Sequence, residues 1–294
     1  MASVDAHNTP STADPDYALS SSSEDEHERL SRQSRLHEQF TRKLFVNAGI
    51  GPGMRVLDVG CGPGDVSFLV REMVGADGLV VGVERDEQAV ATARRRAVAA
   101  GVENVEFLCG DFREIEIDGE PFDALVGRFV LMYQADPADA VMRAAGHVRP
   151  GGVVAFAEIN MPVGSAVPER AYANWPPTPA SEQVNKWVYE AFAKLGTQPD
   201  MGTRLLETFT QAGLEPSPDL ETEFAVVVGE EAISHTVEFL SSLLPAILGA
   251  GIATEEEIDI DTLPERLRAG TSSAGRVRGW PPGIGAFATK PSGA

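Results

Sequence analysis

The sequence predicts an α/β fold in which helices cover both faces of a doubly wound, mostly parallel sheet. Between residues 55 and 157, short apolar runs alternate with longer stretches of helical periodicity. Clusters of Gly, Pro and Asp separate these segments, as at 75–78 and 149–152. Such alternation is typical of parallel sheets, whose strands are buried on both faces and therefore continuously apolar. The 294 residues are enough for one large domain or two smaller ones.

The first elements are a tail and a helix. Residues 1–22 are rich in Ser, Thr, Asp and Pro and poor in large apolar residues, which predicts a disordered tail. The tail has no basic start and no apolar segment, so we expect no signal peptide. Hydroxyl and acidic residues then begin a helix over about 21–48, in which Leu36, Phe40 and Leu44 form an apolar stripe.

With this first helix, the core of the fold is expected to span residues 23–158. Its strands are the apolar runs, and its helices follow most of them after a short turn. The expected strands are 55–59, 79–83, 105–109, 122–126 and 152–157, and the expected helices are 65–74, 86–100 and 137–148.

After residue 158 the regular alternation stops. Two largely helical insertions are expected, and because ligands of doubly wound sheets bind beyond the carboxyl ends of the strands, both insertions would roof that crevice. The first insertion is 159–200, with a helix over about 181–195, and the second is 229–281, with a helix over 230–248 interrupted near Pro245 and a short helix over 262–269. Core segments lie on either side of the second insertion: 201–228, with a helix over 203–212 and a sixth strand over 224–228, and 282–294, with a last strand over 284–289 and a frayed tail.

The most informative stretch joins the first core strand to the next helix. Asp58 lies in the strand, and Gly60, Gly62 and Gly64 follow in the loop. Glycines allow positive φ and leave the backbone bare for a ligand, and the helix start offers free N–H groups. The spacing is G-x-G-x-G, whereas dinucleotide-binding loops have G-x-G-x-x-G. Pro63 has no N–H for a pyrophosphate, so a nicotinamide-dependent oxidoreductase is the weaker interpretation.

The run V-L-D-V-G-C-G-P-G at 56–64 resembles the first motif of the class I methyltransferases that use S-adenosyl-L-methionine (SAM). The resemblance covers about 26–158 well and the remainder in outline. It implies a Rossmann-like sheet of seven strands with helical cap insertions. It also implies SAM as cofactor, S-adenosyl-L-homocysteine (SAH) as product, and a loop from Asp58 to Gly64 that passes under the methionine part of SAM.

The same resemblance implies further cofactor contacts at the ends of the next two strands. Glu84 ends the second strand, 20 residues after Gly64, where an acid accepts hydrogen bonds from both ribose hydroxyls. Arg85 either flanks the adenine or is a surface charge. Asp111 and Phe112 match the positions that contact the adenine amino group and ring, although an Asp-containing turn is the alternative.

Two other segments are candidates for the methionine end of the cofactor. Arg128 follows the fourth strand and is expected to pair with Asp58 or with the SAM carboxylate. Nearby aromatic residues, among them Tyr133, either line the acceptor site or simply pack. The E-R-L-S-R-Q run that ends at Gln33 resembles the leader of some small-molecule methyltransferases, where the helix lies over the cofactor. Gln33 and Tyr17 are therefore candidate SAM contacts, against the alternative of a solvated helix face.

The mechanism implied is an in-line transfer of the methyl group, which needs a base only if the acceptor must lose a proton. Candidates for a base or orienting group are Glu158, Asn160, Glu169, His235 and Tyr133. Each has a structural or solvent-exposed alternative. Glu158 is placed best, because it lies at the carboxyl end of a central strand.

The insertions predict the class of acceptor. Their large apolar side chains would form an apolar roof, which suits a small hydrophobic acceptor such as a polyketide, terpenoid, quinone or peptide natural product. The alternatives are simple packing and a homodimer surface. The residues concerned are Trp175, Trp187, Tyr189, Phe192, Phe239, Leu240, Leu243 and Leu244.

Composition excludes several classes of partner. The net charge of −20 argues against nucleic acid and disfavours an anionic membrane. The sequence contains no run of 18 apolar residues, so no membrane-spanning helix is expected. Cys61 and Cys109 show neither disulfide nor metal spacing and the histidines show no ligand pairs, so no metal and a cytoplasmic location are expected. Two other hypotheses stay open: a SAM-binding enzyme that catalyses a cyclisation or rearrangement without methyl transfer, and a methyltransferase acting on a macromolecule.

Overall fold

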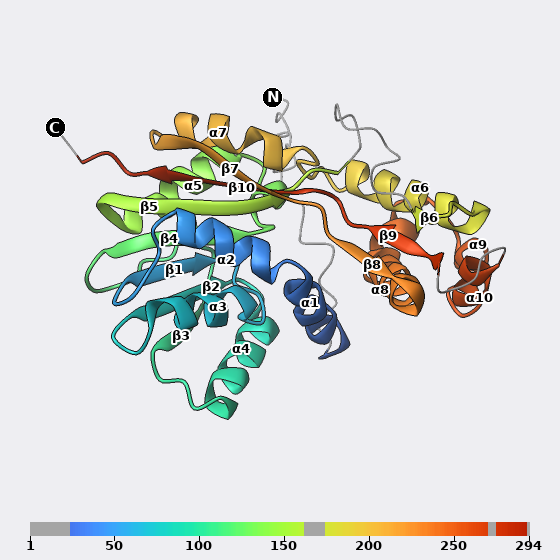
Figure 1. Ribbon diagram of the computed structural model, residues 1–294, viewed down its shortest axis with the longest axis horizontal. Helices are drawn as coiled ribbons and strands as arrows, with labels where there is room; N and C mark the ends of the chain where they lie inside the picture. The colour runs from blue at the N-terminus through green and yellow to red at the C-terminus, as the bar shows by residue number, and fades with distance from the viewer. Residues whose placement is uncertain (1–23, 162–173, 270–274, 293–294) are drawn as a thin grey trace, which may run out of the picture.

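A computed structural model describes residues 24–161, 174–269 and 275–292, and its main body is a seven-stranded sheet (Figure 1). The strand order is β3-β2-β1-β4-β5-β10-β7. The first five are parallel, and β10 is antiparallel to both of its neighbours. The strands are β1 (Arg55–Val59), β2 (Leu79–Glu84), β3 (Val105–Cys109), β4 (Phe122–Arg128), β5 (Val148–Ile159), β7 (Glu215–Glu223) and β10 (Gly283–Thr289). The predicted Rossmann-like, mostly parallel sheet is confirmed.

The central strands are largely apolar because both of their faces are covered. In β1, Val56 belongs to the cluster under one layer of helices, and Leu57 belongs to the cluster under the other. Neighbouring strands alternate in the same way, which is the period of two that a pleated strand imposes. The first layer holds α2 (Glu38–Asn47), α3 (Asp65–Val74) and α4 (Glu87–Ala99), and the second holds α5 (Pro137–Ala144) and α7 (Met201–Gln211).

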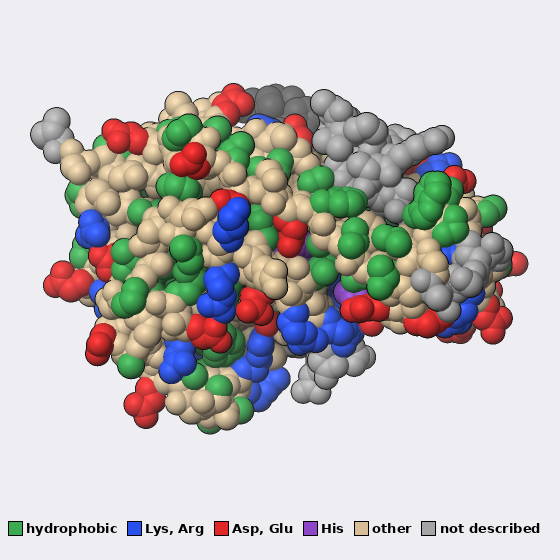
Figure 2. All heavy atoms as spheres, viewed as in Figure 1, with side chains coloured by type: hydrophobic (Ala, Val, Ile, Leu, Met, Phe, Trp, Pro, Cys, Tyr) green, Lys and Arg blue, Asp and Glu red, His purple; other side chains and the backbone are tan. Residues whose placement is uncertain are grey.

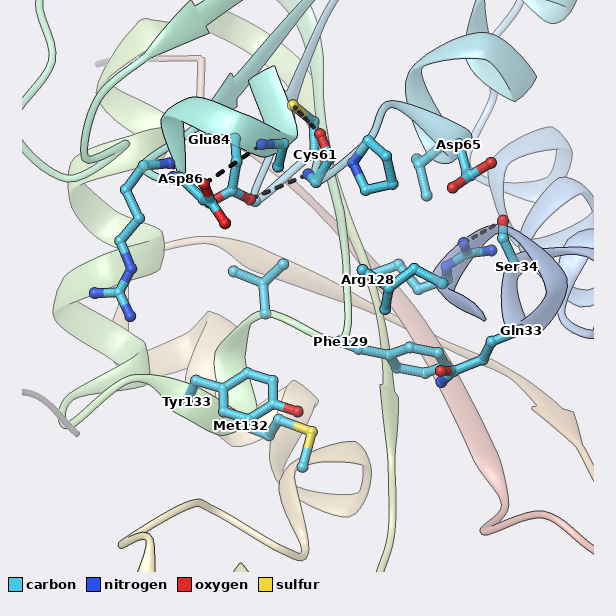
Figure 3. A pocket seen from close by; sticks show the side chains of 18 of the residues that line it. Gln33, Ser34, Cys61, Asp65, Glu84, Asp86, Arg128, Phe129, Met132 and Tyr133 are labelled. Atoms are coloured by element: carbon cyan, nitrogen blue, oxygen red, sulfur yellow. Dashed lines mark hydrogen bonds between the residues drawn. The ribbon is translucent and has the colours of Figure 1, made fainter. Parts of the chain in front are cut away.

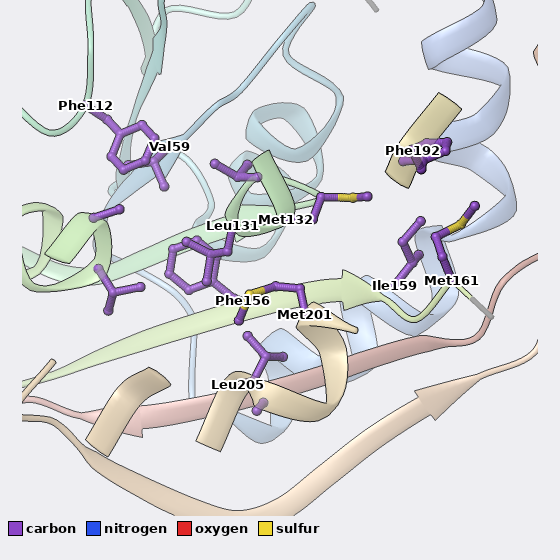
Figure 4. Packing of buried hydrophobic residues seen from close by; sticks show 14 of the residues in the cluster. Val59, Phe112, Leu131, Met132, Phe156, Ile159, Met161, Phe192, Met201 and Leu205 are labelled. Carbon is purple, nitrogen blue, oxygen red and sulfur yellow. The ribbon is translucent and has the colours of Figure 1, made fainter. Parts of the chain in front are cut away.

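A cap made of both insertions lies beside the sheet. It contains α6 (Pro179–Lys194), α8 (Gly229–Gly249), α9 (Glu255–Ile258) and α10 (Leu263–Arg268), with a small sheet of β6 (Asn174–Trp175), β9 (Val277–Gly279) and β8 (Val226–Val228). Figure 4 shows Phe192 of α6 near Ile159, the last residue of β5, and Met161 just beyond it, so core and cap share one apolar cluster. Apolar side chains are also grouped on the outside over the small sheet, where Trp175 and Val228 are exposed (Figure 2).

The first predicted helix is in fact two. Helix α1 (Glu24–Leu36) ends immediately before His37, whose φ of −101° and ψ of 4° are not helical, and α2 begins at Glu38. The ring of His37 is fully buried, and its Nδ1 lies 2.5 Å from Oε2 of Glu223 at the end of β7. This tertiary contact separates α1 from α2, and it was invisible in the periodicity.

The predicted sixth strand was wrong. The strand that pairs with β10 is β7, whose sequence EPSPDLETE has no apolar alternation because it is an edge strand with mostly exposed side chains. The segment expected to be that strand, 224–228, instead contributes β8 to the small sheet of the cap.

The predicted break at Pro245 was also wrong, since α8 is continuous through it. A proline removes one hydrogen bond from a helix, and buried Leu240, Leu243 and Ile247 hold α8 on both sides of that position. By length and composition alone, α8 is the one helix of the described residues that passes as a membrane span. Those buried apolar side chains equally mark a helix packed inside a cap.

Candidate active site

A pocket opens beyond the carboxyl ends of β1, β2 and β4, where doubly wound sheets bind ligands (Figure 3). One end is polar and is lined by the glycine loop and the residues that follow β2 and β3. The other end is apolar and is lined by the turn after β4 and by the cap. Helix α1 contributes Arg29, Leu30, Gln33 and Ser34 to the lining. We call the two ends the polar end and the apolar end.

The glycine loop presents bare backbone to the polar end. Gly60, Gly62 and Gly64 have φ of 63°, 52° and 92°, a region that favours glycine. A Cβ on Gly60 would lie 2.6 Å from Cγ2 of Val130, whereas one on Gly62 would meet nothing within 4 Å. Gly60 and Gly62 line the pocket, and Gly64 is the residue immediately before α3.

Asp58, expected to be a cofactor contact, lies behind the loop and not among the lining residues. It is 1% exposed and accepts a hydrogen bond of 2.6 Å from Oγ of Ser67 in α3. Burial raises the pKa of Asp58 to about 7. In this structure Asp58 joins β1 to α3 and fixes the loop from behind.

Glu84 lines the polar end, and its carboxylate is fastened to the backbone. Its Oε2 accepts from the N–H of Gly62 at 3.1 Å, and its Oε1 accepts from the N–H groups of Arg85 and Asp86 at 2.8 and 3.0 Å. A carboxylate has about four acceptor sites, so capacity remains for a ligand hydroxyl. Arg85 also lines the pocket, with an exposed side chain.

The residues after β3 complete the polar end. Phe112 lines the pocket and is 9% exposed. Asp111 lines it too, and the Arg113 guanidinium donates hydrogen bonds to both of its oxygens, which lowers the pKa of Asp111. The carboxylate is therefore ionised, and Arg113 shares its acceptor sites.

Arg128 lies at the boundary between the two ends (Figure 3). Its guanidinium donates to Oγ of Ser34 at 2.6 Å and to Oγ1 of Thr41 at 3.2 Å. No ion pair with the expected partner Asp58 is found, although that carboxylate lies close enough to raise the pKa of Arg128 against the stronger effect of burial. Gln33, also in the lining, accepts a hydrogen bond from Arg29. Tyr17 lies outside the described residues.

Glu158, the best-placed catalytic candidate, does not line the pocket. It is fully buried, and its Oε1 accepts from the N–H groups of Val130 and Leu131 at 2.9 and 2.7 Å. Burial raises its pKa to about 7. The turn that it holds begins at Phe129, a non-glycine residue with φ of 57°, a strained conformation that costs of order 1–3 kcal/mol. Glu158 therefore positions the lining residues of this turn.

The other candidates for a base or orienting group differ in whether they line the pocket. Asn160 is buried and is hydrogen-bonded to Thr203, and His235 lies behind Trp280, with ring centroids 6.0 Å apart. Neither lines the pocket, whereas Tyr133 does (Figure 3). Glu169 lies outside the described residues.

The apolar end is built by residues that are distant in the sequence. It is lined by Met132 and Tyr133 of the 3-10 turn after β4, Ile159, Phe192, Phe239 and Trp280. Of the predicted roof, Phe192 and Phe239 line the pocket, Trp187, Leu240 and Leu243 are buried in the shared cluster, and Trp175 is 67% exposed.

Sequence reasoning missed Trp280 and the support of the glycine loop. Trp280 precedes Pro281 and Pro282, and an aromatic residue between two strands was the only available signal. Arg96 of α4 donates to the carbonyl of Pro63 at 2.6 Å and pairs with Asp65 at 2.8 Å. Its place on the helix gave no hint of that contact.

Comparison with known proteins agrees with this geometry. A family model described as a methyltransferase domain matches residues 50–213, more than half of the chain. The demethylmenaquinone methyltransferase of Staphylococcus aureus strain MRSA252 is 29% identical over 43% of this chain and 52% of its own length. The aklanonic acid methyltransferase DauC of Streptomyces sp. strain C5 is 26% identical over 55% of this chain and 80% of its own length. The match thus spans about half the length of the first of these relatives.

Solved structures share the fold. A Bacillus halodurans C-125 protein aligns with a TM-score of 0.57 over 85% of this chain and 98% of its own, at 19% identity. YcgJ of Bacillus subtilis aligns with a TM-score of 0.55 over 86% of this chain and 99% of its own, at 19% identity. The [4+2]-cyclase SpnF aligns with a TM-score of 0.52 over 87% of this chain and 81% of its own, also at 19% identity. At such identities the likeness concerns the fold alone.

Proposed function

The chain belongs to the methyltransferase-domain family, whose cofactor is SAM, and we propose that it transfers a methyl group from SAM to a small, largely apolar acceptor. The observation that carries the proposal is the pocket itself. Its polar end has the carboxylate and bare backbone that suit a nucleoside, and its apolar end has the aromatic side chains that suit a hydrophobic acceptor.

Each residue of the polar end has a proposed role in binding SAM. Glu84 would accept from the ribose hydroxyls with the acceptor capacity that its backbone contacts leave. Phe112 and Asp111 would contact the adenine, and the backbone of Gly60 and Gly62 would face the methionine part. Arg128, a half-buried cation without a carboxylate partner among the described residues, would hold the methionine carboxylate.

The protein's own part in the reaction is alignment and exclusion of water. SAM supplies an activated methyl group and its leaving group. Phe129, Met132 and Trp280 line the pocket and would enclose the space where the acceptor meets the methyl group, and Glu158 holds the turn after β4 in place. Of the three proposed catalytic residues only Tyr133 lines the pocket, so we assign it the orientation of the acceptor by hydrogen bonding.

The test is a calorimetric titration with SAH, the product, and with NAD as a control ligand. Micromolar binding of SAH is expected, with a loss of about a hundredfold in Glu84→Ala and no binding of NAD. Glu87→Ala is the matched control, because Glu87 is an exposed acid one turn further on and does not line the pocket. SAH binding that is indifferent to Glu84 would overturn the cofactor site.

The acceptor would then be sought by mass spectrometry as a gain of one methyl group. The second candidate, cyclisation without methyl transfer, shares its fold with SpnF, and an unchanged product mass would favour it. The names of the relatives favour methyl transfer. A cytoplasmic location is part of the proposal, and fractionation of the host cells tests it.

A further inference from the structure

A buried arginine stands behind the apolar end of the pocket. Arg278 of β9 is 6% exposed, and its Nη1 donates to Oγ1 of Thr236 at 3.1 Å. Its Nε has no hydrogen-bond partner, and among the described residues no carboxylate lies within ion-pair distance. A buried charge without a counter-ion is costly, and proteins retain few of them.

The charge of Arg278 lies directly behind the aromatic wall of the pocket. The carbon at the centre of the guanidinium is 5.4 Å from the ring centroid of Trp280 and 5.8 Å from that of Phe239. Both rings line the apolar end. Aromatic rings and the apolar cluster around them screen a charge poorly, so the field of Arg278 reaches the acceptor site.

No carboxylate of the described residues forms an ion pair with Arg278, although Glu231 and Glu238 of α8 lie near His235 beside the same aromatic wall. Burial lowers the pKa of Arg278 to about 10, and the Tyr189 hydroxyl is the only group that acts in the opposite direction. His235 packs against the same Trp280, but burial lowers its pKa, so it carries no negative charge and little positive charge. Among the described residues that line the apolar end, none is a carboxylate or an imidazole.

We propose that the acceptor is a weakly acidic aromatic alcohol or enol, bound as its anion, and that Arg278 makes the site selective for that anion. The inference rests on the proposed methyl transfer and names its substrate class. The hydroxyl proton leaves to water, so no side chain has to remove it during transfer. The anion then forms the bond to the methyl carbon, the bond from that carbon to sulfur breaks, and its electron pair stays on sulfur, which leaves SAH neutral.

The test is the ionisation of a bound coloured naphthol. The probe is 4-nitro-1-naphthol, which has two rings and an anion that absorbs visible light, titrated on the 294-residue chain saturated with SAH. We expect its pKa in the complex to be lower than in water. In Arg278→Met the pKa of the bound probe should rise by about one unit relative to wild type, the size of a unit charge acting across a ring at an effective dielectric constant near 20.

Two variants separate charge from packing. Arg278→Lys keeps the charge and should keep most of the lowered pKa, and Thr236→Val removes the hydrogen bond of Arg278 but keeps the charge, with the same result expected. The neutral 1-methoxy-4-nitronaphthalene should bind with the same affinity, within about threefold, to wild type and to Arg278→Met.

The result with wild type alone is decisive if Arg278→Met does not fold. A pKa of the bound naphthol at or above its value in water overturns the proposal, as does failure of the naphthol to bind to the SAH complex. An equal pKa in wild type and in folded Arg278→Met overturns the role of Arg278. Failure of SAH itself to bind overturns the proposed function instead, so the two failures are distinguishable.

Discussion

The two ends of the pocket are built by opposite means. Apart from helix α1, which covers it, the polar end comes from one continuous stretch, residues 60–113, and relies on backbone: three left-handed glycines and a carboxylate that three N–H groups hold. The apolar end comes from five separate segments and relies on side chains: the turn after β4, the end of β5, α6, α8 and the segment after β9. Backbone geometry tolerates little change, whereas packed side chains can be exchanged.

This contrast predicts where variants will act. Substitutions at the polar end should affect folding and cofactor binding together, because the loop that binds also connects β1 to α3. Substitutions at the apolar end should affect the acceptor and leave cofactor affinity unchanged. The following predictions test that division, beginning with the largest expected effect.

Gly60→Ala should be the most damaging single change. It combines a left-handed backbone with a Cβ placed 2.6 Å from Val130, so we expect the free energy of unfolding to fall by about 3 kcal/mol or more. Gly62→Ala is the matched control, since its φ is also positive but its Cβ would meet nothing; it should cost about 1 kcal/mol. Denaturant unfolding measures both, and equal losses would contradict the steric explanation.

Trp280→Ala should weaken binding at the apolar end by about a hundredfold, because a buried aromatic wall is typical of the positions that dominate binding energy. Absorbance titration with 4-nitro-1-naphthol measures this loss, and calorimetry should show an SAH dissociation constant within about twofold of wild type. Trp175→Ala is the control, because Trp175 is 67% exposed. A parallel loss of SAH affinity in Trp280→Ala would mean that the two ends are not separable.

The same contrast explains how much could be predicted from the sequence. The sheet, its helices and the polar end follow from local signals: apolar runs, turn residues and the glycine spacing around Asp58 and Glu84. Even there, the sequence could not tell that Asp58 faces Ser67 of α3 and not the pocket, because a position near the end of β1 is compatible with either orientation of the side chain.

The apolar end depends on contacts between distant segments, and sequence patterns do not encode these. Trp280 lines the pocket only because β9 pairs with β8 and β6 in a small sheet made of both insertions. The break at His37 depends on Glu223, 186 residues away. The edge strand β7 has exposed side chains and therefore no apolar pattern at all.

Arg128→Met should lower the affinity for SAH by about thirtyfold, the order expected for the loss of a charge-assisted contact with the methionine carboxylate. Binding of 5′-methylthioadenosine, which lacks that carboxylate, should stay within about twofold of wild type. Calorimetry with both ligands makes the comparison. An equal loss for both would show that Arg128 acts by holding Ser34 and Thr41 in place.

Glu158→Gln should change the pH dependence of stability. The pKa of Glu158 is about 7 when folded, against 4.5 for its ordinary value, so the folded state holds this proton more tightly. The stability that Glu158 contributes is therefore fully present below about pH 4.5 and is lost as the pH rises towards 7, by up to about 1.4 kcal/mol per pH unit. The Gln variant should lose this slope, while the slope due to Asp58, whose pKa is raised in the same direction, remains.

Denaturant unfolding at several pH values between 5 and 8 measures that slope. The control is Glu87→Gln, an exposed acid whose substitution should leave the slope as in wild type. SAH affinity should also be retained in Glu158→Gln, because a glutamine oxygen can still accept from the N–H groups of Val130 and Leu131. An unchanged slope would show that Glu158 is ionised in the folded protein.

The smallest effect is expected where the two ends are joined at the surface. Arg32 of α1, which covers the polar end, forms an ion pair of 3.2 Å with Glu238 of α8 in the cap, and the two side chains are 36% and 33% exposed. Partly exposed pairs contribute about 0.5 kcal/mol or less, and salt screens them. Glu238→Gln should therefore reduce stability by no more than this amount, and the difference should disappear in high salt.

The kinetics of SAH release from Glu238→Gln decide whether the division between the ends holds. If α1 closes over SAH independently of the cap, loss of this pair should raise the dissociation rate by less than about threefold, in line with its small contribution. Stopped-flow displacement of SAH measures the rate, with Glu231→Gln, another α8 acid, as control. A tenfold increase in the dissociation rate would mean that contact with the cap holds α1 over SAH. The acceptor end would then control access to the cofactor end, and the two ends would not be independent.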